Sequence, residues 1–348
     1  MPHMLITGGA GFIGSHAAVY FVQRGYTVTV LDNLSRGTLL RRHDPNAHFN
    51  WSFLSGQAGI ELVKGDVRDA ATVDALTARA DVILHAAAQT AVTTSVSDPE
   101  TDFLCNALGT FRVLESARRS GRRPTVLFCS TNKVYGENVN TLGVVEQGGR
   151  YRFPAPWADG VPETFSIDRC EHTPYGCSKL TGDLYAQDFG HLYGLRVGVF
   201  RMSCIYGTRQ FGMEDQGWVA WFVIAALSGR PITIFGDGKQ VRDVLWVEDL
   251  LRAYEAFIAR GASVEVYNMG GGPEHTLSLL ELLELIAEEA DVRPALSYAD
   301  WRPSDQKVYV SDIRRARERL GWMPAVTPRE GVRRLIEWTR ANQALFHA

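Results

Sequence analysis

The sequence has few cysteines, no long apolar run and no excess of positive charge. Its 348 residues include five cysteines, none of them in a CxxC pair. We therefore expect no disulfide framework and no metal site, and a reducing compartment. The longest apolar run, residues 219–227, is much shorter than the roughly 20 residues that a membrane-spanning helix needs. The net charge of -3 provides no general basic surface for nucleic acid.

The start of the chain leaves no room for a signal peptide, because the first expected strand begins almost at Met1. We therefore expect a cytoplasmic protein that has neither a nucleic-acid nor a membrane partner.

Residues 1–202 alternate between strand and helix patterns. Strands are expected at 4–6, 27–31, 61–64, 82–85, 125–130 and 196–200, and helices at 12–24, 72–78, 103–120 and 175–192. This alternation predicts an α/β fold, a Rossmann-type doubly wound parallel sheet. Residues 35–59 are polar and resist assignment. Residues 136–172 lack periodicity, and a loop of this length is usually functional or mobile; its place between two candidate motifs favours a functional role.

The alternation weakens after about residue 203, where a short strand (232–235) and an amphipathic helix (277–290) are expected. This change predicts a smaller C-terminal substrate domain that is interleaved with the first. The expected domains are 1–202 plus 238–262 for dinucleotide binding, and 203–237 plus 263–348 for the substrate.

A glycine-rich turn follows the first expected strand and opens the first helix. Its glycines, Gly8, Gly11 and Gly14, have the spacing G-x-x-G-x-x-G. Such glycines permit a tight turn, close approach of the backbone to a pyrophosphate and close helix packing. The helix N-terminus adds free N–H groups for the phosphates.

An acidic residue, Asp32, ends the second expected strand, 18 residues after Gly14. A carboxylate at this point accepts hydrogen bonds from the adenosine ribose and repels a 2′-phosphate, which favours NAD over NADP. Arg36 lies close by and provides a partial counter-argument, since it could meet a 2′-phosphate.

A Y-x-x-x-K pair, Tyr175 and Lys179, lies on one face of an expected helix. A nearby lysine cation, together with a positive nicotinamide ring, is expected to lower the pKa of the tyrosine and make it a base. Thr131 follows the strand 125–130, at the sheet edge where ligands bind, and its hydroxyl suits a sugar hydroxyl.

Six segments resemble, in this order, the extended short-chain dehydrogenase/reductase family of nucleotide-sugar enzymes. They are TGGAGFIG, the Asp-Asn-Leu-Ser from Asp32, the Gly-Asp-Val-Arg-Asp from Gly65, the His-Ala-Ala-Ala-Gln from His85, Ser130 to Gly136, and YGCSK. The resemblance implies catalytic roles for Thr131, Tyr175 and Lys179. The residues expected to contact the cofactor, NAD, are Gly8, Gly11, Phe12, Ile13, Gly14, Asp32, Asn33, Ser35, Arg36, Asp66, Val67, Ala86, Ala88, Gln89, Asn106, Tyr175 and Lys179.

The residues after Thr131 separate the chemistries within that family. Dehydratases of the family carry Asp-Glu there, and its decarboxylases also use a Glu in that tract, whereas this chain has Asn132 and Lys133. Neither residue is a carboxylate acid/base, so dehydration and decarboxylation are disfavoured, although Glu137 is a possible substitute. Reversible oxidation and re-reduction of one carbon, an epimerisation, is the expected reaction.

Further segments resemble the family's 2-epimerases of CDP-hexoses, of the paratose/tyvelose type. They include residues 90–95, 206–211, 215–218, 238–244 and 304–306. Met202 and Cys204 depart from the more polar residues expected there, which bears on the identity of the sugar. Arg242 and Arg302 are the candidates for the diphosphate, because the arginine fork donates two hydrogen bonds at once. The residues expected to contact the nucleotide-diphosphate sugar are Thr131, Asn132, Met202, Ser203, Arg209, Gln210, Gln216, Arg242, Arg302 and Asp305.

Two other functions remain open from the sequence. One is a nucleotide-sugar 4-epimerase of the UDP-glucose type, or another oxidoreductase or dehydratase on the same scaffold. The other is a non-enzymatic NAD-sensing regulator, which would not need the Tyr-Lys pair. The resemblance also implies a homodimer, formed by the helices 103–120 and 175–192.

Overall fold

The computed structural model describes residues 1–39, 46–302 and 305–346, and the chain divides into two compact units. Unit 1 consists of residues 1–134, 172–201 and 251–267, and unit 2 of residues 135–171, 202–250 and 268–348. Residues 40–45 of the unassigned segment, and Ser304 of the segment 304–306, lie outside the described residues.

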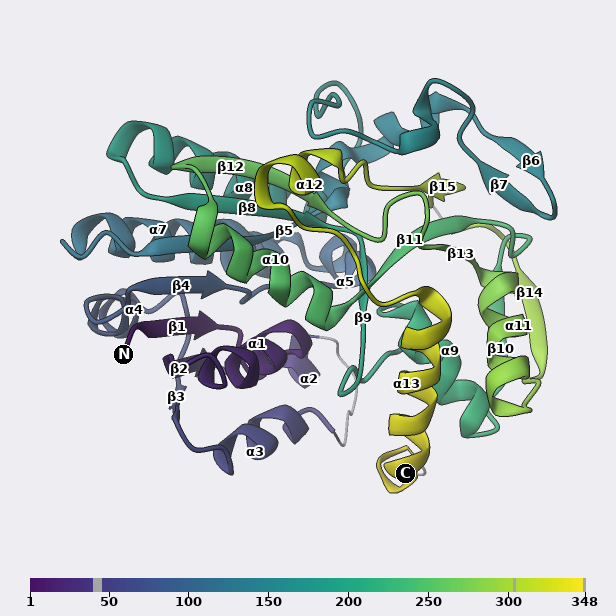
Figure 1. Ribbon diagram of the computed structural model, residues 1–348, viewed down its shortest axis with the longest axis horizontal. Helices are drawn as coiled ribbons and strands as arrows, with labels where there is room; N and C mark the ends of the chain where they lie inside the picture. Colours follow the sequence, from purple (N-terminus) through teal and green to yellow (C-terminus); the bar gives the residue numbers. More distant parts are fainter. Residues whose placement is uncertain (40–45, 303–304, 347–348) are drawn as a thin grey trace. The chain divides into compact units, whose positions relative to one another are not determined.

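Unit 1 is built on a seven-stranded sheet with the order β12-β8-β5-β4-β1-β2-β3 (Figure 1). The pairs that join β3, β2, β1, β4 and β5 are all parallel, as the alternation of strands and helices predicts. The strands are β1 (His3–Thr7), β2 (Thr27–Asp32), β3 (Ile60–Lys64), β4 (Val82–His85), β5 (Thr125–Thr131), β8 (Val197–Met202) and β12 (Val264–Met269).

Helices line both faces of this sheet. The helices are α1 (Phe12–Val22), α2 (Arg36–Leu39), α3 (Phe49–Ser55), α4 (Ala70–Thr77), α5 (Val92–Ser97), α6 (Pro99–Phe103), α7 (Gly109–Arg119) and α8 (Thr173–Tyr193). Helix α10 (Val247–Arg260) runs from unit 2 into unit 1.

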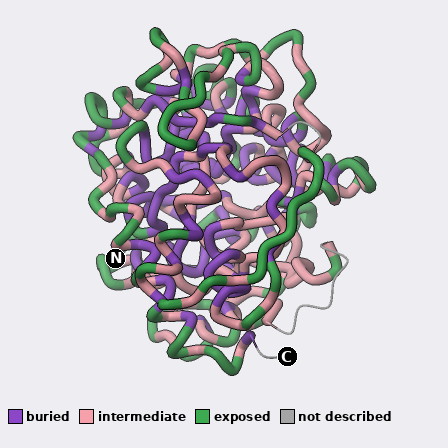
Figure 2. The backbone as a smooth tube through the Cα atoms, turned by 90° about the vertical axis from the view of Figure 1, so that its right-hand side faces the viewer, coloured by how far each residue is buried: buried purple, intermediate pink, exposed green. Residues whose placement is uncertain are grey.

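One core cluster joins a face of the sheet to α4, α7 and α8, with Phe128 of β5 and Phe189 of α8 among its buried residues. On the opposite face α1 packs against β1 and β2, and Tyr254 of α10 contacts Cys129 and Phe200. The Tyr20 hydroxyl of α1 donates to Glu255 of α10 at 2.6 Å. Both faces of the central strands are therefore buried, which explains their continuous apolar runs; Figure 2 colours the burial along the chain.

Unit 2 contains a four-stranded sheet centred on β11 (Val241–Trp246). Strand β11 pairs antiparallel with β13 (Thr276–Ser278) and parallel with β15 (Val308–Tyr309) and β9 (Cys204–Tyr206). The remaining strands form two small pairs, β10 (Ile232–Phe235) with β14 (Leu296–Ala299), and β6 (Val145–Gln147) with β7 (Arg150–Arg152).

Helices α9 (Trp218–Leu227), α11 (Leu279–Ala290) and α13 (Pro328–Ala341) pack on one another in unit 2. The unit also holds α12 (Arg314–Leu320) and the 3-10 segments Trp157–Asp159 and Gln343–Leu345, while the 3-10 segment Asn132–Leu142 begins in unit 1 and ends in unit 2. Across the described residues, no helix combines the length and the apolar character that crossing a bilayer requires.

The helix expected at 103–120 differs most from the structure, and the bounds of the other expected helices shift by two residues at most. The helix expected at 103–120 is instead α6, a π-helix (Leu104–Leu108) and α7, and it starts earlier because Asp98 caps the N-terminus and Pro99 occupies the first turn. The helix expected at 277–290 begins at Leu279, because Ser278 and Glu281 form a capping box that ends β13.

The expected domain ranges also differ from the compact units. Residues 238–250 belong to unit 2 because β11 pairs with β9, β13 and β15, which are all unit 2 strands. Residues 135–171 also lie in unit 2, whereas most of β12 completes the sheet of unit 1. The ligand of each domain stays a prediction.

Candidate active site

The glycine-rich turn lies between β1 and α1, as predicted. Gly8 has a φ of +69°, and a Cβ there would lie 2.5 Å from the backbone nitrogen of Ala87. A Cβ on Gly14 would lie 2.5 Å from the carbonyl oxygen of Gly8. The turn therefore requires glycine at both positions, and Gly11 adds no side chain over the first N–H groups of α1. A cradle of this kind fits a pyrophosphate.

Asp32 lies at the end of β2 and braces this turn. Its carboxylate accepts hydrogen bonds from the backbone N–H of Ala10 at 3.0 Å and of Leu34 at 2.8 Å. Burial raises the pKa of Asp32, and the two backbone hydrogen bonds oppose that rise. Asp32 thus stands beside the glycine cradle.

The next cofactor candidates lie at the ends of neighbouring strands. Asn33 donates to the Asp66 carboxylate at 2.8 Å, and its own Oδ1 accepts from the N–H of Ser35 at 3.0 Å. Arg68 also binds Asp66, at 2.7 Å, and holds the pKa of that carboxyl at about 2. Asp66 is therefore an anion that is already paired within the chain.

Val67 is buried after β3 and packs near Gly109, while Phe12 and Ile13 open α1 and Arg36 opens α2. A further group lies just beyond β4. The N–H of Ala86 donates to the Thr7 carbonyl at 3.1 Å, which aligns the residues up to Ala88 along the glycine turn. Gln89 is buried, and its N–H donates to Asn106 at 2.8 Å. The structure thus brings the predicted cofactor residues to one edge of the sheet of unit 1.

The predicted catalytic residues converge from β5 and α8. Thr131 ends β5, and its side chain lies close enough to Tyr175 to oppose the rise that burial causes in the tyrosine pKa. Lys179 is buried, and its ammonium donates to the Cys129 carbonyl at 2.6 Å and lies 4.5 Å from the centre of the Phe128 ring. Asn132 is buried next to Thr131, whose hydroxyl lies 3.3 Å from Asn132 Oδ1.

The chain alone does not lower the pKa of Tyr175, and the lowering expected with the nicotinamide ring stays a prediction. Burial raises the pKa of Tyr175 to about 12, and the Thr131 side chain opposes this rise. Burial also lowers the pKa of Lys179 to about 8. Because burial raises its pKa, Tyr175 is protonated at neutral pH in the chain by itself, while the Lys179 ammonium donates to the Cys129 carbonyl.

The substrate candidates of unit 2 are largely engaged within the chain. Arg242 binds Asp305 at 2.6 Å, and Arg302 binds Asp215 at 3.1 Å while lying 4.0 Å from the centre of the Phe235 ring. An incoming diphosphate would therefore compete with two carboxylates.

Other substrate candidates of unit 2 lie on or shortly after the strands β8 and β9. Ser203 donates to the Asp243 carboxylate at 2.5 Å, and Gln210 donates to the Ile205 carbonyl at 3.2 Å. Arg209 has a positive φ of 52°, and burial lowers its pKa to about 10. Gln216 closes a tight turn with Met213 through two backbone hydrogen bonds, and Met202 is half-buried at the end of β8.

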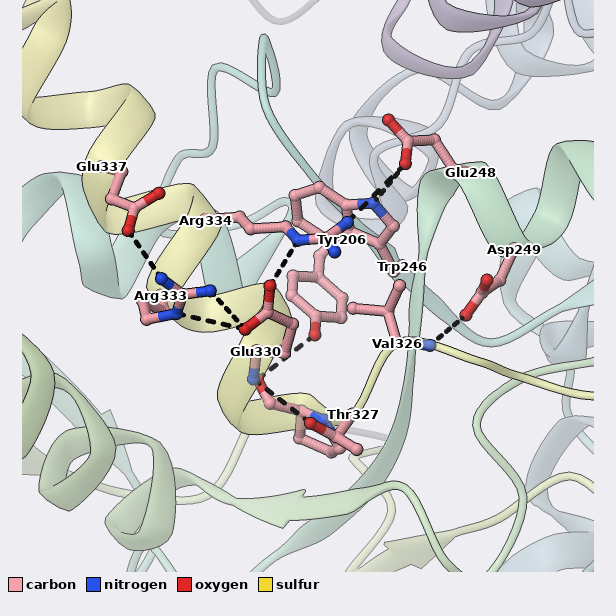
Figure 3. Close-up of polar contacts among 11 residues, drawn as sticks. Tyr206, Trp246, Glu248, Asp249, Val326, Thr327, Glu330, Arg333, Arg334 and Glu337 are labelled. Carbon is pink, nitrogen blue, oxygen red and sulfur yellow. Dashed lines mark hydrogen bonds and ion pairs between the residues drawn. The ribbon is translucent and has the colours of Figure 1, made fainter.

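Ion pairs on the C-terminal helix α13 lie close to these strands. Glu330 binds Arg333 at 2.6 Å and Arg334 at 2.7 Å, and the Arg334 guanidinium lies 5.8 Å from the centre of the Trp246 ring (Figure 3). The Tyr206 hydroxyl contacts the first turn of α13 through the Pro328 carbonyl, at 3.4 Å. Helix α13 thereby packs against β9 and β11, which lead to the substrate candidates.

Three buried acidic residues were missed from the sequence. Asp243 accepts hydrogen bonds from Ser203, Ser311 and Gly272. Asp183 binds Arg201 at 3.0 Å and accepts from Ser130 at 2.6 Å, and Asp102 accepts from Ser178. A charged residue inside an apolar strand was a usable signal for Asp243. For Asp102 the signal was its partner Ser178, which lies inside the Y-x-x-x-K segment. Within the described residues, no group of His, Cys, Asp or Glu is arranged to hold a metal.

The whole chain is similar to known nucleotide-sugar enzymes. The model of the NAD dependent epimerase/dehydratase family matches residues 4–270. The chain is 37% identical to CDP-paratose 2-epimerase of Salmonella typhi, over 97% of this chain and 98% of that protein. It is 32% identical to a putative UDP-glucose 4-epimerase of Methanocaldococcus jannaschii, over 97% and 99%.

Among solved structures, the UDP-glucose 4-epimerase of Thermotoga maritima with UDP-glucose matches with a TM-score of 0.81 and 30% identity. That match covers 98% of this chain and 99% of the other.

Proposed function

The chain belongs to the NAD dependent epimerase/dehydratase family, and from this premise we propose that it is an epimerase that inverts C2 of a CDP-hexose of the paratose/tyvelose type. The observation that carries epimerisation is the tract after Thr131. Asn132 lies buried there beside the Thr131 hydroxyl, where a dehydratase would need a carboxylate. The similarity to CDP-paratose 2-epimerase over nearly the whole chain supports the choice of carbon and nucleotide.

The cofactor is NAD, and unit 1 fits it. In the proposed arrangement the backbone of Gly8, Gly11 and Gly14 holds the pyrophosphate, and Asp32 holds the adenosine ribose. Asp66 and Val67 border the adenine. When bound, NAD supplies the hydride acceptor and donor for one sugar carbon, together with a positive charge that favours the Tyr175 phenolate.

Tyr175 moves the proton in this proposal. Its phenolate takes the proton from the sugar hydroxyl during oxidation and returns it after the keto-sugar has turned in the site. The Thr131 hydroxyl, whose side chain acts on the pKa of Tyr175, orients the sugar hydroxyl between them. The Lys179 ammonium, which donates a hydrogen bond to the Cys129 carbonyl, places a positive charge beside this pair.

The test is to incubate the purified protein with CDP- and other nucleotide-hexoses and to follow the sugar protons by NMR. Inversion at C2 of a CDP-hexose is the expected result, and Tyr175→Phe should reduce turnover by roughly a hundredfold or more. Inversion at C4 with C2 untouched would support the 4-epimerase instead. Loss of water or accumulation of NADH would support a dehydratase or a dehydrogenase, and no turnover of any sugar would support an NAD-sensing regulator.

We also propose that two copies associate through α5, α6 and α8. These helices carry exposed apolar side chains, namely Val96, Phe103, Leu184, Tyr185, Leu192 and Tyr193. Exposed apolar side chains gathered on neighbouring helices are typical of protein interfaces. The cytoplasmic location stays a prediction.

A further inference from the structure

A π-helix interrupts the helical segment that leads into α7. It spans Leu104–Leu108 and contains the buried Asn106. The Oδ1 atom of Asn106 accepts from the N–H of Gln89 at 2.8 Å. Its Nδ2 lies 3.0 Å from the Gln89 carbonyl, 3.1 Å from Asp102 and 3.0 Å from Ser178. Single π-turns inside helices often occur at functional sites. This turn points an amide toward the helix that carries Tyr175 and Lys179.

Asp102 lies one helical turn before Asn106 and is only 1% exposed. Its carboxylate accepts from the Ser178 hydroxyl at 2.5 Å and from the Asn106 amide at 3.1 Å. Both donors are neutral. Burial of a carboxylate costs free energy that such hydrogen bonds offset only in part, so a negative charge at this place calls for an explanation.

Ser178 connects Asp102 to the proposed catalytic residues. It lies on α8 between Tyr175 and Lys179, and its single hydroxyl hydrogen has Asp102 at 2.5 Å and the Tyr175 carbonyl at 3.1 Å. The shorter contact directs the hydrogen to Asp102. The turn of α8 that carries both residues is thus tied to the segment before α7.

Asp102 also acts on Tyr175 and Lys179 through its charge. The Asp102 carboxylate raises the pKa of both Lys179 and Tyr175. The other ionisable groups that act on Lys179 are Cys129 and Asp183, and Lys179 in turn lowers the pKa of His85. Cys129 also acts on Tyr175, from β5. Asp102 acts on both members of the pair from the α6 side.

We propose that Asp102 is a positioning residue for the reaction: through Ser178 and Asn106 it fixes the turn of α8 that carries Tyr175 and Lys179. This inference rests on the proposed catalytic role of Tyr175 and Lys179. Its first test, however, needs neither cofactor nor substrate.

That test is the titration of Lys179 by NMR of protein labelled with ¹³C at lysine Cε. The chain has five lysines, so the signals are few: Lys64, Lys133, Lys179, Lys239 and Lys307. The wild-type Lys179 signal, assigned by its loss in Lys179→Met, should titrate near the pKa of about 8. Asp102→Asn should lower that midpoint, because it removes one of the three groups that raise the pKa of Lys179 against the effect of burial. If Asp102→Asn does not fold, Asp102→Ser carries the same expectation.

The matched control is Asp98→Ala. Asp98 caps the N-terminus of α6 by accepting from the N–H of Thr101 at 3.1 Å, so its loss weakens the helix that carries Asp102 without removing the Asp102 charge. An unchanged Lys179 midpoint in the Asp102 variant would overturn the proposal. An equal shift in Asp98→Ala would overturn it as well, because the effect would then be only structural.

The second test uses turnover. Ser178→Ala removes the link but no charge, and it should lower kcat roughly tenfold with KM little changed. Ser116→Ala is the control, because Ser116 is buried on α7 and its hydroxyl has no hydrogen-bond partner among the described residues. A wild-type kcat in Ser178→Ala would contradict the positioning role. If the wild type turns over no sugar, the proposed function fails, and the lysine titration still decides the role of Asp102.

Discussion

At the scale of single residues, the buried His85 makes the fold sensitive to acid. Thr110 donates its hydroxyl hydrogen to the Asn106 carbonyl, so its oxygen accepts from His85 Nε2, 3.0 Å away. His85 Nδ1 then accepts from the Thr7 hydroxyl at 2.7 Å. Both ring nitrogens are satisfied in the neutral form, and burial lowers the pKa of His85 to about 3.

This arrangement predicts a loss of stability in acid. Between pH 6.5 and 3 the unfolded chain binds a proton at His85 and the folded chain does not. The free energy of unfolding should therefore fall with decreasing pH by up to about 1.4 kcal/mol per pH unit from this residue. Urea unfolding at several pH values should show a smaller slope for His85→Gln. The same substitution at the exposed His191 is the control, and an equal change in slope there would contradict the assignment.

A second prediction at this scale concerns Gly8. In Gly8→Ala the new Cβ meets the Ala87 backbone at 2.5 Å and the residue keeps a positive φ. We expect a loss of about 2–4 kcal/mol and the disappearance of the rise in melting temperature that NAD gives the wild type. Thermal unfolding with and without NAD measures both effects.

Gly25→Ala separates the effect of a positive φ from the effect of the clash with the Ala87 backbone. Gly25 also has a positive φ, of 82°, but a Cβ there has no atom within 4 Å among the described residues. It should lose only about 1 kcal/mol and keep the response to NAD. If Gly8→Ala behaved in the same way, the close approach of the turn to Ala87 would not matter.

At the scale of helices and strands, α13 packs very closely on β9. A Cβ on Gly331 would lie 2.0 Å from the Tyr206 hydroxyl oxygen. Gly331→Ala should therefore destabilise the protein by about 1–3 kcal/mol. Because the clash is with the hydroxyl, Tyr206→Phe should recover part of that loss in the double variant, and chemical denaturation of the four proteins gives the coupling.

The control for this prediction is Gly56→Ala. Gly56 has an ordinary negative φ, and its nearest contact to an added Cβ would be 3.8 Å. The change should be close to neutral. Strict additivity of Gly331→Ala and Tyr206→Phe would show that the two residues are not in contact in solution.

The strands were the part of the fold that local sequence best predicted. Residues 82–85 and 232–235 are strands with the expected bounds, because their apolar runs are short and bounded by polar or turn residues. The segment at 103–120 was harder to predict, because a π-helix cannot be recognised from a hydrophobic pattern with a period of 3.6 residues.

For the candidate site residues of each unit, sequence predicted local relations but not the partners that tertiary structure provides. The Tyr175–Lys179 spacing placed both on one helix, since that relation is local. The pairing of Arg242 with Asp305, and of Lys179 with the Cys129 carbonyl, spans many residues and depends on tertiary structure. The pKa of Tyr175 could not be predicted either, because burial dominates it.

At the scale of the whole molecule, the exposed apolar side chains of α8 predict a dimer. We expect the wild type to sediment as a dimer, and Leu184→Glu to shift it toward a monomer, because Leu184 is 48% exposed on α8 and a charge there opposes association. Sedimentation velocity measures this. Val145→Glu, at an equally exposed apolar residue on β6, is the control. A monomeric wild type would contradict the proposed association.

The interleaving of the two units has a consequence for synthesis of the chain. The sheet of unit 1 takes β8 and most of β12 from segments that follow two excursions into unit 2. Residues 1–134 alone hold only the strands β1 to β5 of that sheet. During translation one edge of β5 therefore stays unpaired until β8, residues 197–202, has left the ribosome. Until then the nascent chain is exposed at β5 to strand pairing with other chains.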